Sequence, residues 1–460
     1  MKFNKSDRVI QNSSKTNSQF EKMTKTPVQK LIVQLAVPSI ISMLVTTVYN
    51  LVDTAFVGTL GNSASGAIGI VFGFMSILQA IGFLFGQGSG SVISRLLGQR
   101  KTSEATEYAS TGFFLAFFIA AIVSVLSFIF LDDIILFLGS TDTIAPYAKI
   151  YIGYILSTAP FQVVSFTMNN ILRYEGKAFY GMIGLFSGAI INIAGDAIFM
   201  FGMNMGIKGA GLSTAISQFL SFLFLIIPFL TGKTQTKLSI INFKINKIMI
   251  DIFTTGTPSL IRQGINSVST ILLNFVSKPY GDEAIAAMSI VSRIFFFVVS
   301  IAIGVGQGFQ PVSGFNYGAK KYGRLRKAYG FTILLSTILV TIFGIVIFIL
   351  APQLVKLFRD DDKVIKIAVF ALRFQCAGII FLPYCMTSEM MLQTTGQIIQ
   401  ASFLSACRSG LVLIPLLLIL VHFFGLLGIQ TAQGCAFVLT TIPTAIMAIS
   451  FFNKTPKIDE

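Results

Sequence analysis

Twelve stretches of this chain are each long and apolar enough to cross a lipid bilayer, and this constrains the fold more than any other feature. A transmembrane helix needs about 20 mostly apolar residues. Hydrophobic residues make up 54% of the 460 and charged residues only 12%, which excludes a water-soluble enzyme, a disordered chain and a secreted disulfide scaffold. The predicted spans are residues 31–57, 65–93, 107–131, 144–170, 179–202, 207–230, 250–276, 285–313, 328–351, 364–387, 398–424 and 428–452.

The positive charges predict the orientation of these spans. With the N-terminus in the cytoplasm, the tails and the cytoplasmic loops hold most of the 34 Lys and Arg residues, as the positive-inside rule requires. The net charge of +15 then needs no nucleic acid partner. Residues 1–30 are polar and lack the apolar core of a signal peptide, so we expect a cytoplasmic tail there.

An internal repeat predicts two lobes. Shifting the sequence by 220 residues places Pro38 on Pro258, and the shift holds as far as Gly176 on Gly396; a shift of 222 then places Gly206 on Gly428. Six spans per copy is an even number, so the copies are parallel repeats related by a pseudo-twofold axis along the membrane normal. The predicted parts are an N-terminal tail (1–30), an N-lobe (31–230), a cytoplasmic interlobe linker (231–249), a C-lobe (250–452) and a cytoplasmic C-terminal tail (453–460).

Two acids, Asp53 and Asp196, lie clearly within predicted spans, at a similar depth in the outer half of the membrane. Intramembrane acids are costly and mark ion pathways. Asn192 precedes Asp196 by one helical turn, and Thr214 reaches the same depth in span six. The shifts of 220 and 222 place Leu273 and Leu418 at the positions of the two acids, so we expect the ion chemistry to be confined to the N-lobe.

Polar residues also recur at helical spacing, which a lipid-facing surface would penalise. The pattern favours a water-accessible cavity, with a buried polar seam between helices as the alternative. Two stripes carry it: Ser39, Ser42, Thr46, Asn50 and Asp53 in span one, and Tyr147, Tyr151, Tyr154, Thr158, Gln162, Ser165 and Asn169 in span four. We place the substrate cavity at Tyr49, Asn50, Tyr151, Tyr154, Gln162, Asn169 and Asn266.

The cysteines, prolines and glycines within the spans are best explained by helix packing and helix geometry. The four cysteines lie in apolar stretches without ligand spacing, so we expect no metal or redox site. Pro38 should kink span one, and the Gly-Gln-Gly triplets that begin at Gly86 and Gly306 favour close helix packing. For the intramembrane arginines, salt bridging and contact with substrate both stay open: Arg262, Arg293, Arg373 and Arg408.

Three segments resemble the multidrug and toxic compound extrusion (MATE) family: VPSIISMLVTTVYNLVDTAFVG in span one, INIAGDAIFMFGMNMGIKGAGLSTAIS across spans five and six, and GQGFQPVSGFNYGAKK after span eight. The resemblance covers about residues 25–452. It implies an antiporter that expels amphipathic, often cationic drugs and dyes while H⁺ or Na⁺ moves inward. It also implies a first-lobe cation site at Asp53, Asn192, Asp196 and Thr214, cavity residues at Tyr151 and Asn169, and a hinge at Pro38.

Two other functions compete with this interpretation. A lipid-linked flippase of the same wider superfamily is one alternative, and an intramembrane aspartyl hydrolase is another from a different class. We expect no enzymatic activity and no cofactor besides the coupling ion, which is H⁺ or Na⁺. We expect a monomer in a cell membrane, with bacterial origin, both termini in the cytoplasm, and small-molecule drugs and the lipid bilayer as its partners.

Overall fold

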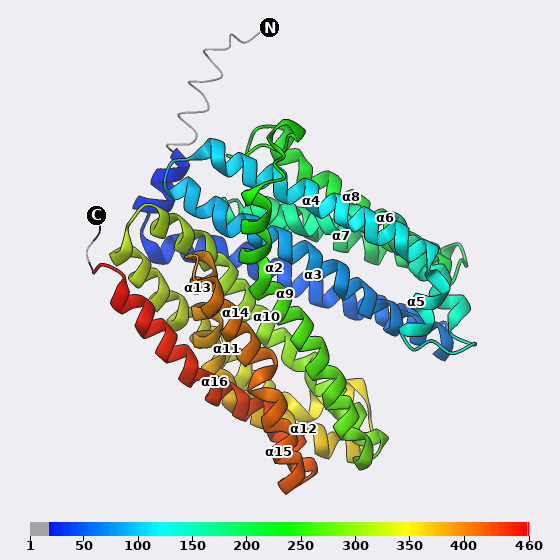
Figure 1. Cartoon of the computed structure of the whole chain (residues 1–460). Helices are drawn as coiled ribbons and strands as arrows, with labels where there is room; N and C mark the ends of the chain where they lie inside the picture. Colours follow the sequence, from blue (N-terminus) through cyan, green and yellow to red (C-terminus); the bar gives the residue numbers. More distant parts are fainter. Residues whose placement is uncertain (1–17, 458, 460) are drawn as a thin grey trace. The chain divides into compact units, whose positions relative to one another are not determined.

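The computed structural model describes residues 18–457 and 459, and within this part of the chain the structure is helical throughout, without strands (Figure 1). The main helices of the first half are α2 (Val28–Gly58), α3 (Asn62–Gly98), α4 (Thr102–Ile129), α5 (Leu131–Phe137), α6 (Ala145–Tyr174), α7 (Ala178–Asp196), the π-helix η1 (Ala197–Gly202) and α8 (Ile207–Leu230). A 3₁₀ turn, η2 (Ile240–Asn242), follows. The second half contains α9 (Lys247–Ser277), η3 (Lys278–Tyr280), α10 (Asp282–Gly318), α11 (Tyr322–Phe358), α12 (Asp362–Gly378), η4 (Ile379–Phe381), α13 (Leu382–Thr394), α14 (Ile398–Ala406), the π-helix η5 (Cys407–Leu411), α15 (Leu413–Phe424) and α16 (Leu426–Lys454).

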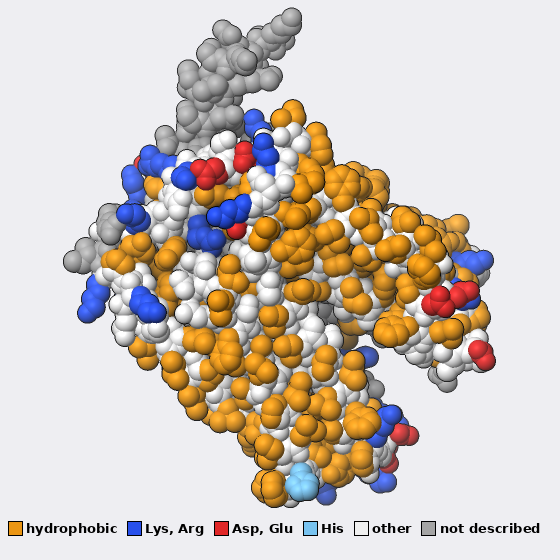
Figure 2. Space-filling model, in the orientation of Figure 1, with side chains coloured by type: hydrophobic (Ala, Val, Ile, Leu, Met, Phe, Trp, Pro, Cys, Tyr) orange, Lys and Arg blue, Asp and Glu red, His pale blue; other side chains and the backbone are white. Residues whose placement is uncertain are grey.

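The predicted all-α membrane fold is confirmed. Eleven helical segments of the described chain are long and apolar enough to cross a membrane. The twelfth predicted span is α9, a helix of 31 residues whose hydropathy is lowered by Arg262 and by several amide side chains. Figure 2 shows hydrophobic side chains covering much of the visible helix surface, with charged side chains gathered near helix ends, as expected where lipid replaces water.

The helices form two compact units, and two helices, α2 and α9, are divided between them. The first unit contains the described residues up to Lys25 and Leu44–Gly256, and the second contains Thr26–Met43 and the chain from Thr257 onwards. The beginning of α2 therefore belongs to the second unit, and the beginning of α9 to the first. These boundaries differ from the predicted lobes, which were divided between whole spans.

Glycines of the two Gly-Gln-Gly triplets pack against these divided helices. A Cβ on Gly88 would lie 2.2 Å from the carbonyl oxygen of Ile252, at the start of α9. A Cβ on Gly308, the equivalent glycine of the second unit, would lie 2.5 Å from the backbone nitrogen of Ala36, at the start of α2. Each triplet thus packs a helix directly against backbone, the role that the sequence favoured.

The segment predicted as an interlobe linker is bound along the first unit. The buried Glu175 carboxylate accepts hydrogen bonds from the backbone amides of Gln235 (2.8 Å) and Thr236 (3.1 Å) and from the Thr236 hydroxyl. Burial raises the pKa of the Glu175 carboxyl, and the hydrogen bonds oppose this shift. Further along, the Ser110 hydroxyl donates to the carbonyl of Lys237 (2.9 Å). The segment is therefore held by specific contacts rather than only by its ends.

The structure corrects the repeat offset at the last helix of each unit. Gly206 (φ 56°, ψ −131°) and Gly425 (φ 58°, ψ −128°) precede α8 and α16 with the same left-handed backbone. Gly209 and Gly428, three residues later in each case, both abut the backbone of the preceding helix, at Phe199 and Leu420 respectively. The predicted match of Gly206 with Gly428 is therefore wrong.

The corrected register places Leu417, and not Leu418, at the position of Asp196, because Phe199 matches Leu420. The shift from Phe199 to Leu420 exceeds the shift from Gly176 to Gly396 by one residue. The π-helix η5 lies between Gly396 and Leu420, and a π-helical turn is the usual way for a helix to absorb one extra residue. A sequence comparison without gaps does not reveal this local insertion.

Candidate functional site

The four residues predicted to hold the coupling cation lie together in the first unit. Asn192 donates through Nδ2 to the hydroxyl oxygen of Thr214 (3.2 Å). Tyr151 donates to Oδ2 of Asp53 (3.4 Å), and its hydroxyl lies 3.5 Å from that of Thr214. The carboxyl groups of Asp53 and Asp196 are direct neighbours. Tyr151 was predicted to line the substrate cavity, and the structure places its hydroxyl in contact with Asp53 and Thr214 instead.

The acid pair leaves several oxygens unpaired. Asp196 and Asn192 are buried, and neither carboxylate oxygen of Asp196 accepts a hydrogen bond from the described residues. Oδ1 of Asp53 and Oδ1 of Asn192 are also buried without a partner there. Two adjacent carboxylates in a poorly solvated place cannot both carry a charge without a large cost. The arrangement can be balanced by a proton or by a cation with oxygen ligands.

Small residues bring α7 and α8 close enough to form this site. A Cβ on Gly195 would lie 2.5 Å from the Ser213 hydroxyl, and that hydroxyl donates to the backbone carbonyl of Asn192 (2.8 Å). Gly195 and Ser213 were not singled out from the sequence. Their position directly beside Asp196 and Thr214 is the signal that would have identified them.

Leucines occupy the positions in the second unit that match the two acids. Leu273, which matches Asp53, packs against a cluster that contains Leu417 and Ala432, the residues that match Asp196 and Ser213. Leu417 is 1% exposed, whereas Leu418, the residue predicted to match Asp196, is 47% exposed. Asp196 therefore has a buried leucine as its counterpart, as predicted, but this residue is Leu417 and not Leu418.

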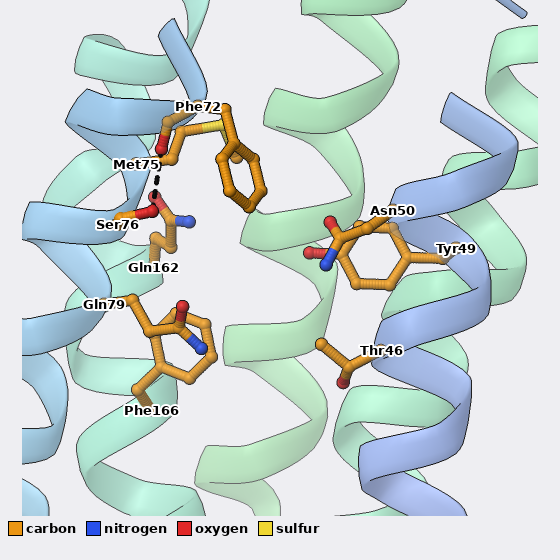
Figure 3. Close-up of a pocket in the computed structure, with 9 residues that line it drawn as sticks. All are labelled: Thr46, Tyr49, Asn50, Phe72, Met75, Ser76, Gln79, Gln162 and Phe166. Carbon is orange, nitrogen blue, oxygen red and sulfur yellow. Dashed lines mark hydrogen bonds between the residues drawn. The ribbon is translucent and has the colours of Figure 1, made fainter. Parts of the chain in front are cut away.

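A pocket of about 320 Å³, counted with its opening, lies in the same unit as the acid pair. Figure 3 shows side chains of α2 on one side of the space and side chains of α3 and α6 on the other. Among the predicted cavity residues, Tyr49, Asn50 and Gln162 line it. The complete lining is Thr46, Tyr49, Asn50, Phe72, Met75, Ser76, Gln79, Gln162 and Phe166. The pocket therefore offers amides, hydroxyls and aromatic rings, and no charged side chain.

The remaining predicted cavity residues do not line this pocket. Tyr154 packs where a Cβ on Gly211 would lie 2.7 Å from its ring, and the buried Asn169 lies equally close to Gly181. Asn266 is exposed and belongs to the second unit. Pro38 lies inside the continuous helix α2, in the part that groups with the second unit.

The resemblance to the MATE family is confirmed by comparison with known proteins. The sequence profile of the MatE family matches twice, at residues 38–198 and 258–419, and the second match begins at Pro258, the repeat partner of Pro38. The multidrug export protein MepA of Staphylococcus aureus (strain N315) is 30% identical over 407 residues, which cover 88% of this chain and 90% of MepA. MepA of Staphylococcus saprophyticus is 28% identical over the same shares.

Solved structures share the fold over almost the whole chain. An outward-facing multidrug resistance MATE transporter of the MOP superfamily has a TM-score of 0.90, with 24% identity over 95% of this chain and 98% of its own. A MATE structure in the bent conformation has a TM-score of 0.87, with 25% identity over 95% and 97%. With the double profile match and the S. aureus relative, these findings show that the chain belongs to the MATE family of multidrug export proteins.

Proposed function

We propose that this multidrug efflux transporter exports amphipathic, often cationic compounds and that Asp53 and Asp196 couple export to the inward movement of H⁺ or Na⁺. The observation that carries this proposal is the pair of adjacent carboxyl groups with buried, unpartnered oxygens. In a folded membrane protein such groups mark an ion pathway. The relatives are exporters, and we infer that the acid pair serves coupling rather than hydrolysis.

Coupling requires only that the cationic compound and the coupling ion compete for the negative charge of the acid pair. While the pair is ionised it attracts a cationic compound to the first unit. A proton or Na⁺ that arrives from outside neutralises the pair, so the attraction is lost and the compound leaves outward. Exchange of one monovalent ion for one monovalent cation moves no net charge, so the concentration gradient of the ion drives it. A membrane potential adds roughly 2.3 kcal/mol per 100 mV for each elementary charge that moves inward in excess. Alternating access then releases the ion to the cytoplasm.

The residues around the pair are compatible with either ion. A proton needs only the two carboxyl groups. Na⁺ is a hard cation and would take oxygens from Asp53, Asp196, Asn192 and Thr214, in keeping with the preference of hard cations for oxygen ligands. Within the described residues no group of three or more His, Cys, Asp or Glu side chains gathers at one place, so the amide and hydroxyl oxygens would have to complete the shell.

The test is efflux of a cationic dye from proteoliposomes with independently imposed proton and sodium gradients. We expect at least one gradient to drive export against a dye gradient, and the ion that does so is the coupling ion. Dye movement that ignores both gradients would overturn antiport. Binding of the dye without any transport would overturn the exporter assignment itself.

We further propose that the transporter is a monomer in the plasma membrane with both termini in the cytoplasm.

Two exposed positions test the orientation. Ile241, in the segment that precedes α9, is 82% exposed, and Phe137, at the end of α5, is 90% exposed. The four native cysteines are free and none is exposed. We expect a membrane-impermeant maleimide to label a Phe137→Cys variant in intact cells and an Ile241→Cys variant only after permeabilisation. The opposite pattern would reverse the orientation.

A further inference from the structure

The chain between α8 and α9 exposes large apolar side chains although it connects two spans. We call residues 231–250, which include the first turn of α9, the connecting segment. Its residues Ile240, Ile241 and Ile245 are all exposed. A single exposed isoleucine is ordinary on a protein surface, but three that gather in one short stretch form an apolar patch that is unfavourable in water.

Contacts with α4 place the connecting segment beside a membrane span. The backbone amide of Lys244 donates to the Thr111 hydroxyl (3.1 Å). The centroid of the Phe243 ring lies 6.0 Å from that of Phe114 and 6.1 Å from that of Phe118. All three α4 residues lie within the third predicted span. The connecting segment therefore packs along a membrane-spanning helix and does not extend away from it.

The α4 surface next to Phe243 has the character of a lipid-facing surface. Phe118, Ile122, Val125 and Ile129 follow one another at steps of three and four residues, so they share one face of α4, and all four are exposed. An exposed apolar face on a transmembrane helix contacts acyl chains. Because Phe243 packs against Phe118, the apolar patch of the connecting segment continues this face toward the start of α4.

The lysines of the connecting segment have no acidic partners. The segment contains four lysines and no acid. Lys237, Lys244 and Lys247 are exposed, and no acid in the part of the chain that the structure describes forms an ion pair with them. Asp251, the next acid along the chain, accepts a hydrogen bond from the Tyr108 hydroxyl (2.8 Å). Three unpaired positive charges thus accompany the apolar patch.

Exposed isoleucines together with unpaired lysines suit the surface of a bilayer that contains anionic lipids. In an interfacial segment, apolar side chains enter the boundary between headgroups and acyl chains, and lysines beside them attract lipid phosphates. A free anion in water would balance the lysines and leave the isoleucines in contact with water. The contact between Phe243 and Phe118 favours lipid for a second reason, because it joins the patch to a surface that already contacts acyl chains.

We propose that the connecting segment lies at the membrane surface and binds anionic phospholipids. Its three exposed isoleucines reach the boundary between headgroups and acyl chains, and its three unpaired lysines bind the phosphate groups. In the orientation proposed above, these lipids belong to the cytoplasmic leaflet. The binding itself depends neither on that orientation nor on the export function.

The test is fluorescence quenching by brominated lipids in vesicles. The chain contains no Trp, so a single introduced Trp reports only its own surroundings. Ile241→Trp places this reporter in the apolar patch. Val125→Trp is the matched control, because Val125 is exposed on the lipid-facing surface of α4, a helix without Lys or Arg. The vesicles contain phosphatidylcholine with a minor share of either phosphatidylglycerol or phosphatidylcholine that is brominated at the same acyl positions.

We expect both brominated lipids to quench the Ile241→Trp reporter, with phosphatidylglycerol preferred at least about fivefold. This ratio corresponds to about 1 kcal/mol, the attraction of one lysine to an anionic membrane surface. The Val125→Trp reporter should be quenched equally by both lipids. In the Ile241→Trp background, Lys237→Gln/Lys244→Gln/Lys247→Gln should remove the preference and preserve quenching by phosphatidylcholine. Added salt should also weaken the preference, because it screens the lysines.

Three outcomes would overturn the proposal. Equal quenching of the Ile241→Trp reporter by the two lipids would show that the lysines do not select anionic headgroups. The absence of quenching by either lipid would place the segment in water. Quenching that falls as the protein-to-lipid ratio rises would assign the patch to a second copy of the chain. Dye efflux from the same vesicles tests the export function separately, and its loss would leave the lipid result unaffected.

Discussion

Replacement of Asp53 or Asp196 by Asn is expected to abolish export while the protein remains folded in the membrane. Each substitution preserves the shape of the side chain and removes the charge that can attract a cation or take up a proton. The site already contains buried oxygens without partners, so an amide there should lower stability little in comparison with the loss of function. The measurement is dye export from cells at matched membrane abundance, and wild-type export by either variant would contradict the assignment of the site.

A matched control separates the acid pair from a general loss of negative charge. Asp132 is an exposed acid that pairs with Lys149 (2.7 Å), and exposed pairs contribute little. We expect Asp132→Asn to export as the wild type does. Proton release on drug binding should disappear in the Asp53→Asn/Asp196→Asn double variant if H⁺ is the coupling ion, since two adjacent carboxyl groups are expected to take up and release protons together. Undiminished release there would place the proton elsewhere, with Glu389 and Glu175 the next acids to replace.

The spans, the repeat and the acid pair could be predicted from the sequence alone. Spans and repeats extend over many residues, and an acid within a span is energetically costly and therefore rare. Apolar runs of membrane length are rare outside transmembrane helices, and an acid inside such a run is conspicuous. Shorter polar interruptions are harder to interpret. Thr387, Ser388 and Glu389 end the apolar pattern of the tenth span, so it was predicted to stop at residue 387, whereas α13 continues to Thr394.

Glu389 was therefore placed in a loop, and its pairing with Arg262 and Arg408 was not anticipated. Hydropathy along one segment does not reveal a polar patch that helices of the same unit bury together. The lining of the pocket was likewise predicted only in part. Asn50 and Gln162 were predicted because they belong to polar stripes, whereas Gln79 and Ser76 of α3 were not, because the rest of their span is apolar. Side chains supplied by a neighbouring helix are determined by packing and not by local periodicity.

The second large effect is expected from a single methyl group at Gly428. A Cβ at this position would lie 2.2 Å from the carbonyl oxygen of Leu420 and 2.6 Å from the backbone nitrogen of Val421. Backbone atoms cannot move aside as a flexible side chain does, so α15 and α16 would have to separate. We expect Gly428→Ala to destabilise the protein by about 3 kcal/mol, the upper part of the usual range for overpacking.

Unfolding of the second unit can be followed through its own cysteines. Cys376, Cys385 and Cys407 are buried, so a thiol-reactive fluorogenic dye reports their exposure on heating, in a chain that contains no Trp. Gly264→Ala is the matched control, because its added Cβ would meet no atom within 4 Å other than those of the adjacent residues and of the neighbouring backbone of α9. A helical Gly→Ala change of this kind is neutral or stabilises by up to about 1 kcal/mol. Equal unfolding midpoints for Gly428→Ala and Gly264→Ala would contradict the close approach of α15 to α16 at Gly428.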